Sequence, residues 1–320
     1  MTNIELSKAI LSIVESHTAG SPTDEKVKWT YLTPREIAEA YEQIHGERIS
    51  NQVIKRLLKQ AGYVKRKPSK SIEIGKSPYR KEQFKIIKFL KVLFTEMENN
   101  PIISIDTKKK ERLGLLTRGQ ALLSNKNVPL YDHDYDYLSE GKVVPQAIYD
   151  TKQNKGYVTI GTNYETADFI ADNLIWWWET FGVNSYPDAN QILVLCDSGG
   201  ANSYRHHAFK KAMLRVADTI GKIIVIAHYP PYCSKYNPIE RRLFCHMERT
   251  LKGSILSSHE QVKTLFQRTK TQNVDQPLSV EVRIEDKPYQ IGLKTKKEEI
   301  DWNRIYQHPD LPQFSYFIKP

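Results

Sequence analysis

Hydrophobic residues in the first part of the chain recur at the spacing of amphipathic helices. Apolar positions within residues 4–14 fall three and four apart, which predicts a first helix. Residues 33–46 open with Thr-Pro-x-Glu, a capping box with proline at its first helical position, and end in glycine. Residues 50–62 begin at a serine and keep their apolar side chains on one face. Two short capped helices joined by a tight turn predict a helix-turn-helix in an all-α domain over residues 1–67.

The pattern then changes to short apolar runs that alternate with helical segments. We interpret residues 68–81, which are polar and contain Pro and Ser, as a linker, and residues 82–274 as a second domain. Its expected strands lie at 101–106, 143–150, 156–161, 192–197 and 222–228. The second and third should form a hairpin, and helices should follow the third, fourth and fifth.

This order of elements indicates an α/β fold. Strands connected through helices should be parallel, whereas the hairpin should be antiparallel. We therefore expect a mixed five-stranded sheet with helices on both faces. The remaining residues, 275–320, read as a β-rich appendage that includes a hairpin within residues 277–293.

Composition narrows the class of protein. The 320 residues are 40% hydrophobic, and none of the apolar runs approaches the ~18–20 residues of a membrane helix. The N-terminus lacks a secretory pattern, and three cysteines without a C-x-x-C predict no disulfide framework. We expect a cytoplasmic protein with no membrane partner. The net charge of +10, from 47 basic and 37 acidic residues, favours a polyanionic partner.

Basic residues concentrate on and after the third predicted helix. Residues 48–81 hold eleven Lys or Arg against one acidic residue, and residues 63–67 resemble a basic strand or wing. Asn, Gln, Arg and Lys are the side chains that read base edges and phosphates in a major groove. A three-helix packing unit with a solvated face remains the alternative. The predicted DNA contacts are Asn51, Gln52, Lys55, Arg56, Lys59, Lys65, Arg66 and Lys67.

Three carboxylates are expected at one edge of the sheet. Asp106 and Asp197 each end a predicted strand, and Glu240 opens the helix after the last strand. Two such charges ~4 Å apart repel by about 4 kcal/mol at an effective dielectric constant near 20. Hard divalent cations such as Mg²⁺ remove this cost, and two of them can support phosphodiester displacement. The alternative roles are local: a turn residue at each Asp, and a capping box between Asn237 and Glu240.

Other groups of residues have competing interpretations. Lys108, Lys109, Lys110, Lys235 and Arg241 lie near the acids in sequence and are either phosphate contacts or exposed surface. Residues 132–136 contain three aspartates and are a weaker rival metal site. Cys233, Cys245 and nearby histidines are spaced too irregularly for a zinc site, which favours core packing.

The three acidic blocks resemble those of a known family. IDTKKKE (105–111), LVLCDSGGANSYR (193–205) and HYPPYCSKYNPIERRLF (228–244) are similar to blocks of DDE transposases from bacterial insertion sequences. The similarity is to the Rhodopirellula-type group, which is related to the mariner superfamily. The resemblance implies an RNase H-like catalytic domain, as in retroviral integrases.

The resemblance also implies an activity. Asp106, Asp197 and Glu240 would be both catalytic residues and ligands of two Mg²⁺ ions, which Mn²⁺ could replace. The enzyme would cleave transposon ends and join the 3′-OH to target DNA, as a homodimer or higher oligomer and without a small-molecule cofactor. We expect it in the bacterial cytoplasm, associated with the nucleoid. The alternatives are a nuclease of the same fold without strand transfer, and a catalytically silent DNA-binding regulator.

Overall fold

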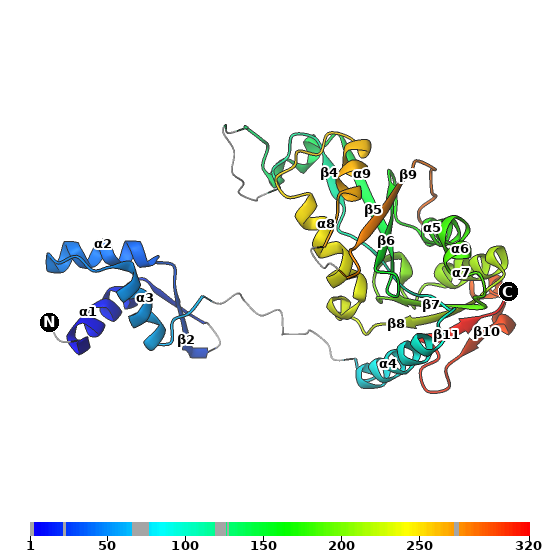
Figure 1. Cartoon of the computed structure of the whole chain (residues 1–320), viewed down its shortest axis with the longest axis horizontal. Helices are drawn as coiled ribbons and strands as arrows, with labels where there is room; N and C mark the ends of the chain where they lie inside the picture. Colours follow the sequence, from blue (N-terminus) through cyan, green and yellow to red (C-terminus); the bar gives the residue numbers. More distant parts are fainter. Residues whose placement is uncertain (1–2, 22–23, 66–76, 119–125, 127, 272–274) are drawn as a thin grey trace. The chain divides into compact units, whose positions relative to one another are not determined.

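The chain forms two compact units, residues 1–73 and 74–320, in a computed structural model (Figure 1). The structure describes residues 3–21, 24–65, 77–118, 126, 128–271 and 275–320. Within these ranges, no helix combines the length and the apolar character that crossing a membrane requires.

Three helices pack around a small apolar core in the first unit. Ile10, Ile37 and Ile54, one from each helix, are fully buried there, together with Tyr41 and Leu57. The helices are α1 (Asn3–Glu15), α2 (Pro34–His45) and α3 (Asn51–Gln60), and an antiparallel strand pair, β1 (Thr18–Ser21) and β2 (Asp24–Thr30), lies between α1 and α2. The three predicted helices are confirmed, whereas the strand pair was not predicted.

Local capping chemistry defines where these helices begin. The Thr33 hydroxyl accepts the Glu36 N–H at 3.3 Å, and Glu36 Oε2 accepts the Thr33 N–H at 2.6 Å, so the expected capping box is present. Ser50 Oγ accepts the Val53 N–H at 3.4 Å. The basic wing expected after α3 is not seen in residues 63–65, which lie in neither a strand nor a helix.

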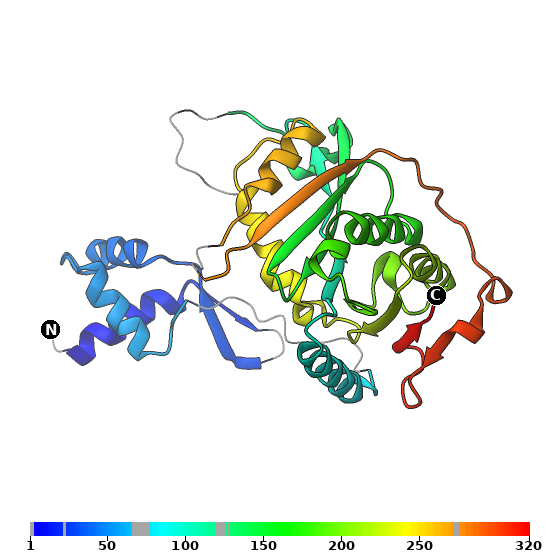
Figure 2. The same cartoon turned by 45° about the vertical axis from the view of Figure 1, so that its right-hand side comes forward.

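A mixed sheet organises the second unit. Its order is β10-β11-β8-β7-β3-β5-β6-β9, and a short strand, β4, pairs with β5 (Figures 1 and 2). The strands are β3 (Ile102–Thr107), β4 (Glu111–Leu113), β5 (Gly141–Asp150), β6 (Lys155–Gly161), β7 (Gln191–Cys196), β8 (Ile223–His228), β9 (Ser279–Glu285), β10 (Ile305–Gln307) and β11 (Ser315–Ile318). The five predicted strands are β8, β7, β3, β5 and β6, which form its contiguous centre. Their directions are confirmed, because β3, β7 and β8 are parallel and the β5–β6 hairpin is antiparallel.

Both edges of the sheet come from the last part of the chain. Strand β9 pairs in parallel with β6, and β11 pairs antiparallel with β8. Figure 2 shows β9, in orange, alongside β6 and β5. The hairpin expected within residues 277–293 is wrong, because only Ser279–Glu285 forms a strand and its partner is β6. The sheet thus extends beyond the five predicted strands.

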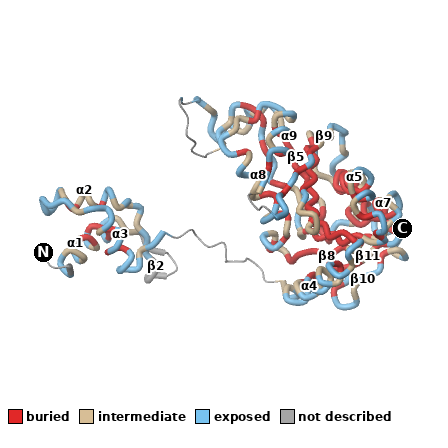
Figure 3. The backbone as a smooth tube through the Cα atoms, viewed as in Figure 1, coloured by how far each residue is buried: buried red, intermediate tan, exposed pale blue. Residues whose placement is uncertain are grey.

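Helices cover both faces of the sheet, as predicted. Residues of β7 alternate: Ile192 and Val194 face α5 and α7, whereas Leu193 and Leu195 face α4. Helices α8 and α9 cover β5 and β6 on the α4 side. Strands β3, β5, β6 and β7 are buried along most of their length, whereas the edge strands β9 and β10 are more open (Figure 3). The helices are α4 (Arg80–Glu96), α5 (Ala167–Trp177), α6 (Val183–Ser185), α7 (His207–Ile220), α8 (Cys245–Thr250) and α9 (His259–Gln267).

Candidate active site

The strand register places two aspartates side by side. Strands β3 and β7 are parallel neighbours, and Ile105 is opposite Cys196 in the ladder. The next residue along each strand is Asp106 or Asp197. Both therefore lie at the carboxyl ends of adjacent parallel strands, which is the edge where sites of open α/β sheets form.

Glu240 is delivered to the same edge by a segment that is fastened to β3. Asn237 and Ser104 are both fully buried, and the Ser104 hydroxyl donates to Asn237 Oδ1 at 2.5 Å. Asn237 Nδ2 donates to the Ile105 carbonyl at 3.2 Å, and the Ile239 N–H donates to Ser104 Oγ at 3.1 Å. We call Ser104 and Asn237 the β3 clamp. The capping-box interpretation of Asn237 is wrong, since its side chain bonds to β3, and a π-helical turn begins at Glu240 without a side-chain cap.

Burial and mutual repulsion disfavour the charged forms of these acids. Burial raises the pKa of Asp106 to about 8, the charge of Asp197 adds to the effect, and the Thr107 N–H, 2.8 Å from Asp106 Oδ1, opposes it. Burial also raises the pKa of Asp197, against the opposing Gly199 N–H at 3.1 Å. Burial raises the pKa of Glu240, and the charge of Asp197 raises it further. The three carboxyls are thus near enough for their charges to interact.

A fourth carboxylate, which the sequence analysis missed, faces the same site. Glu165 lies in the connection between β6 and α5, and its charge contributes to the raised pKa of Asp106. Its Oε2 is 3.9 Å from Lys110 Nζ. A Cβ atom at Gly200, where φ is +58°, would lie 2.9 Å from Glu165 Oε1. Glu165 ends no predicted strand, so the only signal for it was its place just before the Thr166 helix cap.

The loop after Asp197 is tied to the segment after β8. The Tyr229 N–H donates to the Cys196 carbonyl at 2.8 Å, and the Ser198 hydroxyl donates to the Tyr229 carbonyl at 2.5 Å. His228 is fully buried beside Cys196, with 3.1 Å between His228 Nδ1 and Cys196 Sγ. Burial lowers the pKa of His228 to about 3, so its ring is neutral at physiological pH and serves as packing.

The acids fit a cation chemically, although they are not gathered into a ligand cluster. Among the residues that the structure describes, no three His, Cys, Asp or Glu side chains lie close enough together to hold a metal ion. Burial first, and the neighbouring carboxylate charges second, raise the pKa of Asp106 and of Glu240, and a divalent cation nearby would favour the charged forms. Asp106, Asp197 and Glu240 are oxygen donors of the kind Mg²⁺ prefers.

The lysines after Asp106 have different environments. Lys108 is buried, and its Nζ lies 2.6 Å from Glu111 Oε1 and 2.6 Å from Glu248 Oε2. Its ammonium is therefore neutralised within the protein, so its placement favours a structural ion pair over a phosphate contact. Lys109 is exposed, and Lys110 is exposed beside Glu165.

Two further predicted contacts lie on the surface before and after Asn237. Lys235 and Arg241 are exposed, and their charged groups lie 5.3 Å and 6.0 Å from the centre of the Tyr236 ring. Unlike the buried Lys108, both side chains are open to solvent. A cation beside an aromatic ring can contact a phosphate of a nucleic acid while the ring stacks on one of its bases.

Helix α3 separates an apolar face from a polar one. Ile54, Leu57 and Leu58 are buried against the rest of the first unit. The predicted contacts Arg66 and Lys67 lie outside the described residues. Of the predicted contacts on α3, Asn51, Gln52, Lys55, Arg56 and Lys59 are exposed, and Lys65, which follows the helix, is exposed as well.

The aspartates of residues 132–136, the alternative metal site, include one that forms an ion pair. Asp136 forms an ion pair with Arg112 at 2.5 Å, and residues 132–136 belong to no metal-binding group within the described part of the chain. Cys233 is fully buried, in line with core packing.

A helix-flanked mixed sheet with acids at the carboxyl ends of two parallel neighbours is the arrangement of an RNase H-like DDE transposase domain. The family model described as "Rhodopirellula transposase DDE domain" matches residues 9–320, and the chain belongs to that family. No curated protein matches the sequence.

Several solved structures are similar to the chain at low identity. A Mos1 transposase paired-end complex with the left transposon end is 14% identical over 81% of this chain and 68% of that chain, with a TM-score of 0.45. A Mos1 mariner paired-end complex with Mn has the same identity, covers 81% and 69%, and scores 0.44. The catalytic domain of Mos1 mariner transposase, also 14% identical, covers 60% and 80% and scores 0.38.

Proposed function

We propose that the protein cleaves DNA at the ends of its transposon and joins the freed 3′-OH to target DNA, using Asp106, Asp197 and Glu240. Membership of the family supports transposase chemistry in general. The observation that carries the proposal is the placement of Asp106 and Asp197 at the ends of adjacent parallel strands, where their pKa values are raised. Buried acids without a cation partner would be a pure cost to the fold.

The side chains divide the work of this site. Asp106, Asp197 and Glu240 would hold two Mg²⁺ or Mn²⁺ ions, which supply activation of an attacking hydroxyl and stabilisation of the leaving oxygen. The β3 clamp keeps the segment before Glu240 on the strand that carries Asp106. Exposed Lys109, Lys110, Lys235 and Arg241 provide positive charge around the carboxylates, suited to DNA phosphates.

Duplex recognition is assigned to the first unit. Helix α3 presents Asn51, Gln52, Lys55, Arg56 and Lys59 on its exposed face, as a recognition helix does in a major groove. We propose that residues 1–67 bind the transposon ends and that residues 82–274 carry the chemistry. Pairing of two ends requires a homodimer or a larger assembly on DNA, which we include in the proposal.

Asp197→Asn tests the chemistry. The variant should lose Mg²⁺-dependent cleavage of end DNA while its affinity for that DNA stays within about twofold, because asparagine keeps the shape but not the charge. Cleavage at the rate of the unmodified protein would refute the assignment. A pre-cut end separates the two activities: joining to target DNA supports a transposase, and cleavage without joining would indicate a nuclease.

Salt dependence tests the recognition helix. If the first unit contacts ~6 phosphates, affinity for end DNA should fall ~10³-fold between 50 and 200 mM salt. Replacing Lys55 and Arg56 with alanine should flatten that dependence by roughly two phosphate contacts. Lys8→Ala, on helix α1, is the matched control in the same unit. A flat profile for the intact protein would count against this role.

A further inference from the structure

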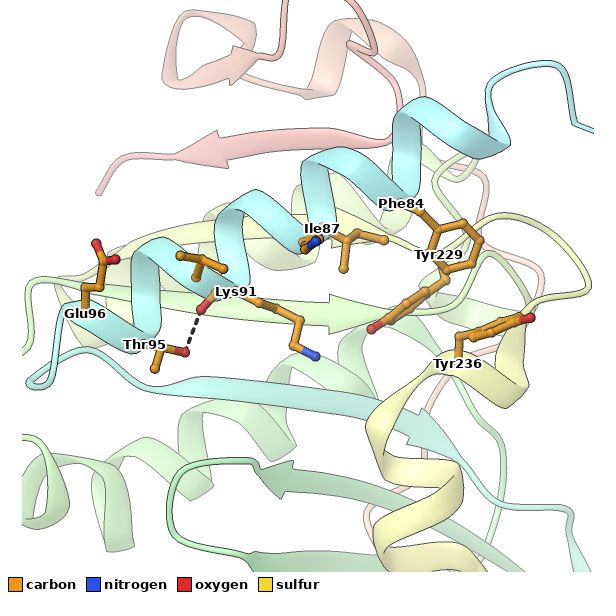
Figure 4. Close-up of a pocket in the computed structure, with 9 residues that line it drawn as sticks. Phe84, Ile87, Lys91, Thr95, Glu96, Tyr229 and Tyr236 are labelled. Carbon is orange, nitrogen blue, oxygen red and sulfur yellow. Dashed lines mark hydrogen bonds between the residues drawn. The ribbon is translucent and has the colours of Figure 1, made fainter.

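A groove on helix α4, separate from the carboxylates, has no role in the function proposed above. It has a volume of about 540 Å³, within the ~300–1,000 Å³ typical of small-ligand sites. Helix α4 forms one wall, and the segment that follows β8 forms the other (Figure 4). We call it the α4 groove; its lining includes Phe84, Lys88, Lys91, Glu96, Tyr229 and Tyr236.

Aromatic rings gather at one end of the α4 groove. Phe84 meets Tyr236 edge-on with 5.1 Å between ring centres, and meets Tyr229 edge-on at 6.1 Å. The Tyr236 residue is 43% exposed, so part of its ring is open to a ligand. An edge-to-face cluster of this kind holds each ring in a fixed direction, which favours stacking by an incoming planar group.

Positive charge lines the middle of the groove. Lys88 is exposed and Lys91 is half-buried, and within the described part of the chain neither ammonium has an acidic partner. Figure 4 shows the Lys91 side chain reaching towards Tyr229, while the one lining carboxylate, Glu96, lies at the far end. Lys235 and Arg241 add charge beside Tyr236. The groove therefore offers phosphate contacts next to a ring.

The backbone connects this groove to the carboxylates. Tyr229 is bonded through its N–H and its carbonyl to Cys196 and Ser198, the two neighbours of Asp197. Tyr236 directly precedes Asn237 of the β3 clamp and stands four residues before Glu240. A strand of DNA whose phosphodiester lies at the acids can thus reach the groove within a few nucleotides.

We propose that the α4 groove binds an unpaired nucleotide of the substrate strand, with its base on Tyr236 and its phosphates on Lys88 and Lys91. A duplex presents no free base face, so the groove would act on a strand that is unpaired next to the cleaved position. The inference rests on DNA being the substrate of the neighbouring acids. Aromatic and basic side chains together are the usual features of single-strand binding, which accepts many sequences.

The test uses the full chain carrying Asp197→Asn in EDTA, so that DNA cleavage does not affect the binding measurement. The probe is a single strand of about twelve thymidines with one central 2-aminopurine. Its anisotropy reports affinity, and quenching of the 2-aminopurine reports stacking. Tyr236→Ala should weaken binding ~10-fold and abolish quenching, whereas Tyr236→Trp should keep both.

Charge variants complete the test. Lys88→Ala combined with Lys91→Ala should reduce the dependence of log affinity on log salt by about 1.4, at ~0.7 for each phosphate contact of a single strand. The matched controls should bind like the parent: Lys85→Ala, exposed on the same helix but outside the groove, and Tyr306→Ala, which is 43% exposed like Tyr236 but lies on β10.

Two results would overturn the proposal. One is parental single-strand binding and quenching by Tyr236→Ala. The other is a result in which the groove variants bind the single strand like the parent but, without DNA, sediment as a smaller species than the parent. That result would make the groove an interface between copies of this chain. Failure of the catalytic assignment is distinguishable, since it appears as Mg²⁺-dependent cleavage that survives Asp197→Asn while the groove variants behave as described.

Discussion

Replacing Asp106 with asparagine should stabilise the metal-free protein at alkaline pH. The pKa of Asp106 in the fold is about 8, well above the ~4 of an unfolded aspartate. A raised pKa means that the fold prefers the protonated form, so this stabilisation is complete below pH ~4 and is lost as pH rises to ~8. Asparagine stays neutral throughout, and its Oδ1 can still accept the Thr107 N–H.

The pKa difference sets the size of the effect. One unit corresponds to about 1.4 kcal/mol, so four units set an upper limit of roughly 5 kcal/mol. Because the neighbouring Asp197 interacts with Asp106 and takes part in the same titration, we expect roughly 2–4 kcal/mol in favour of Asp106→Asn near pH 8. Near pH 4 the two proteins should have nearly equal free energies of unfolding.

Urea unfolding followed by tryptophan fluorescence measures this difference across the pH range. In EDTA the advantage of the variant should grow with pH, and saturating Mg²⁺ should stabilise the unmodified protein more than the variant near pH 8. Asp172→Asn is the matched control with the opposite sign. Although burial opposes them, hydrogen bonds from Lys287, Arg215 and Tyr289 hold the pKa of Asp172 below its ordinary value.

The control should therefore lose stability near pH 8, lose less as pH falls, and ignore Mg²⁺. The reasoning would be refuted if Asp106→Asn were destabilising near pH 8 in EDTA, or if its advantage did not depend on pH. An equal response of both proteins to Mg²⁺ would contradict the assignment of Asp106 as a metal ligand.

Three further predictions concern the supports of the site. Ser104→Ala should lower the free energy of unfolding by about 1–3 kcal/mol, because it leaves buried polar groups of Asn237 and Ile239 unpaired. In a double-mutant cycle with Asn237→Ala the two effects should be non-additive. Additive effects would argue against the β3 clamp. Lys108→Met should lower the free energy of unfolding, measured by urea denaturation, by roughly 3 kcal/mol without changing the salt dependence of DNA binding. Lys109→Ala, at an exposed position, should reduce the salt dependence of DNA binding and leave the free energy of unfolding unchanged. Gly200→Ala and Gly221→Ala should each lower the free energy of unfolding by about 1 kcal/mol, since φ is positive at both positions. Only Gly200→Ala should also slow cleavage, because its Cβ would press on Glu165. Equal cleavage rates for the two variants would contradict a role for Glu165.

Much of the central sheet and two of the acids follow from local patterns. Apolar runs of strand length, joined through helical segments, specify parallel neighbours, and the carboxyl ends of such strands share one edge. Asp106 and Asp197 follow directly from that rule. The caps at Thr33 and Ser50 were also predictable, because every atom involved lies within three residues.

Features that depend on distant partners were out of reach. Asn237 has the local spacing of a cap, but its partner, Ser104, lies 133 residues away. Lys108 stands in a run of three lysines, and nothing in that run distinguishes the one that Glu248 neutralises. Strand β9 alternates as an edge strand should, yet its partner β6 is more than a hundred residues upstream, so a local hairpin was the simpler prediction.

The origin of both sheet edges has a consequence for synthesis. While a ribosome is still producing residues beyond β8, the nascent chain presents β6 and β8 as open edges with unpaired backbone groups. Such edges can pair with another chain, which is a route to aggregation. Strands β9 and β11 close them only when residues 279–318 have emerged. The second unit should therefore complete its fold late in translation, and chaperones that shield open strands should affect its yield more than its final stability.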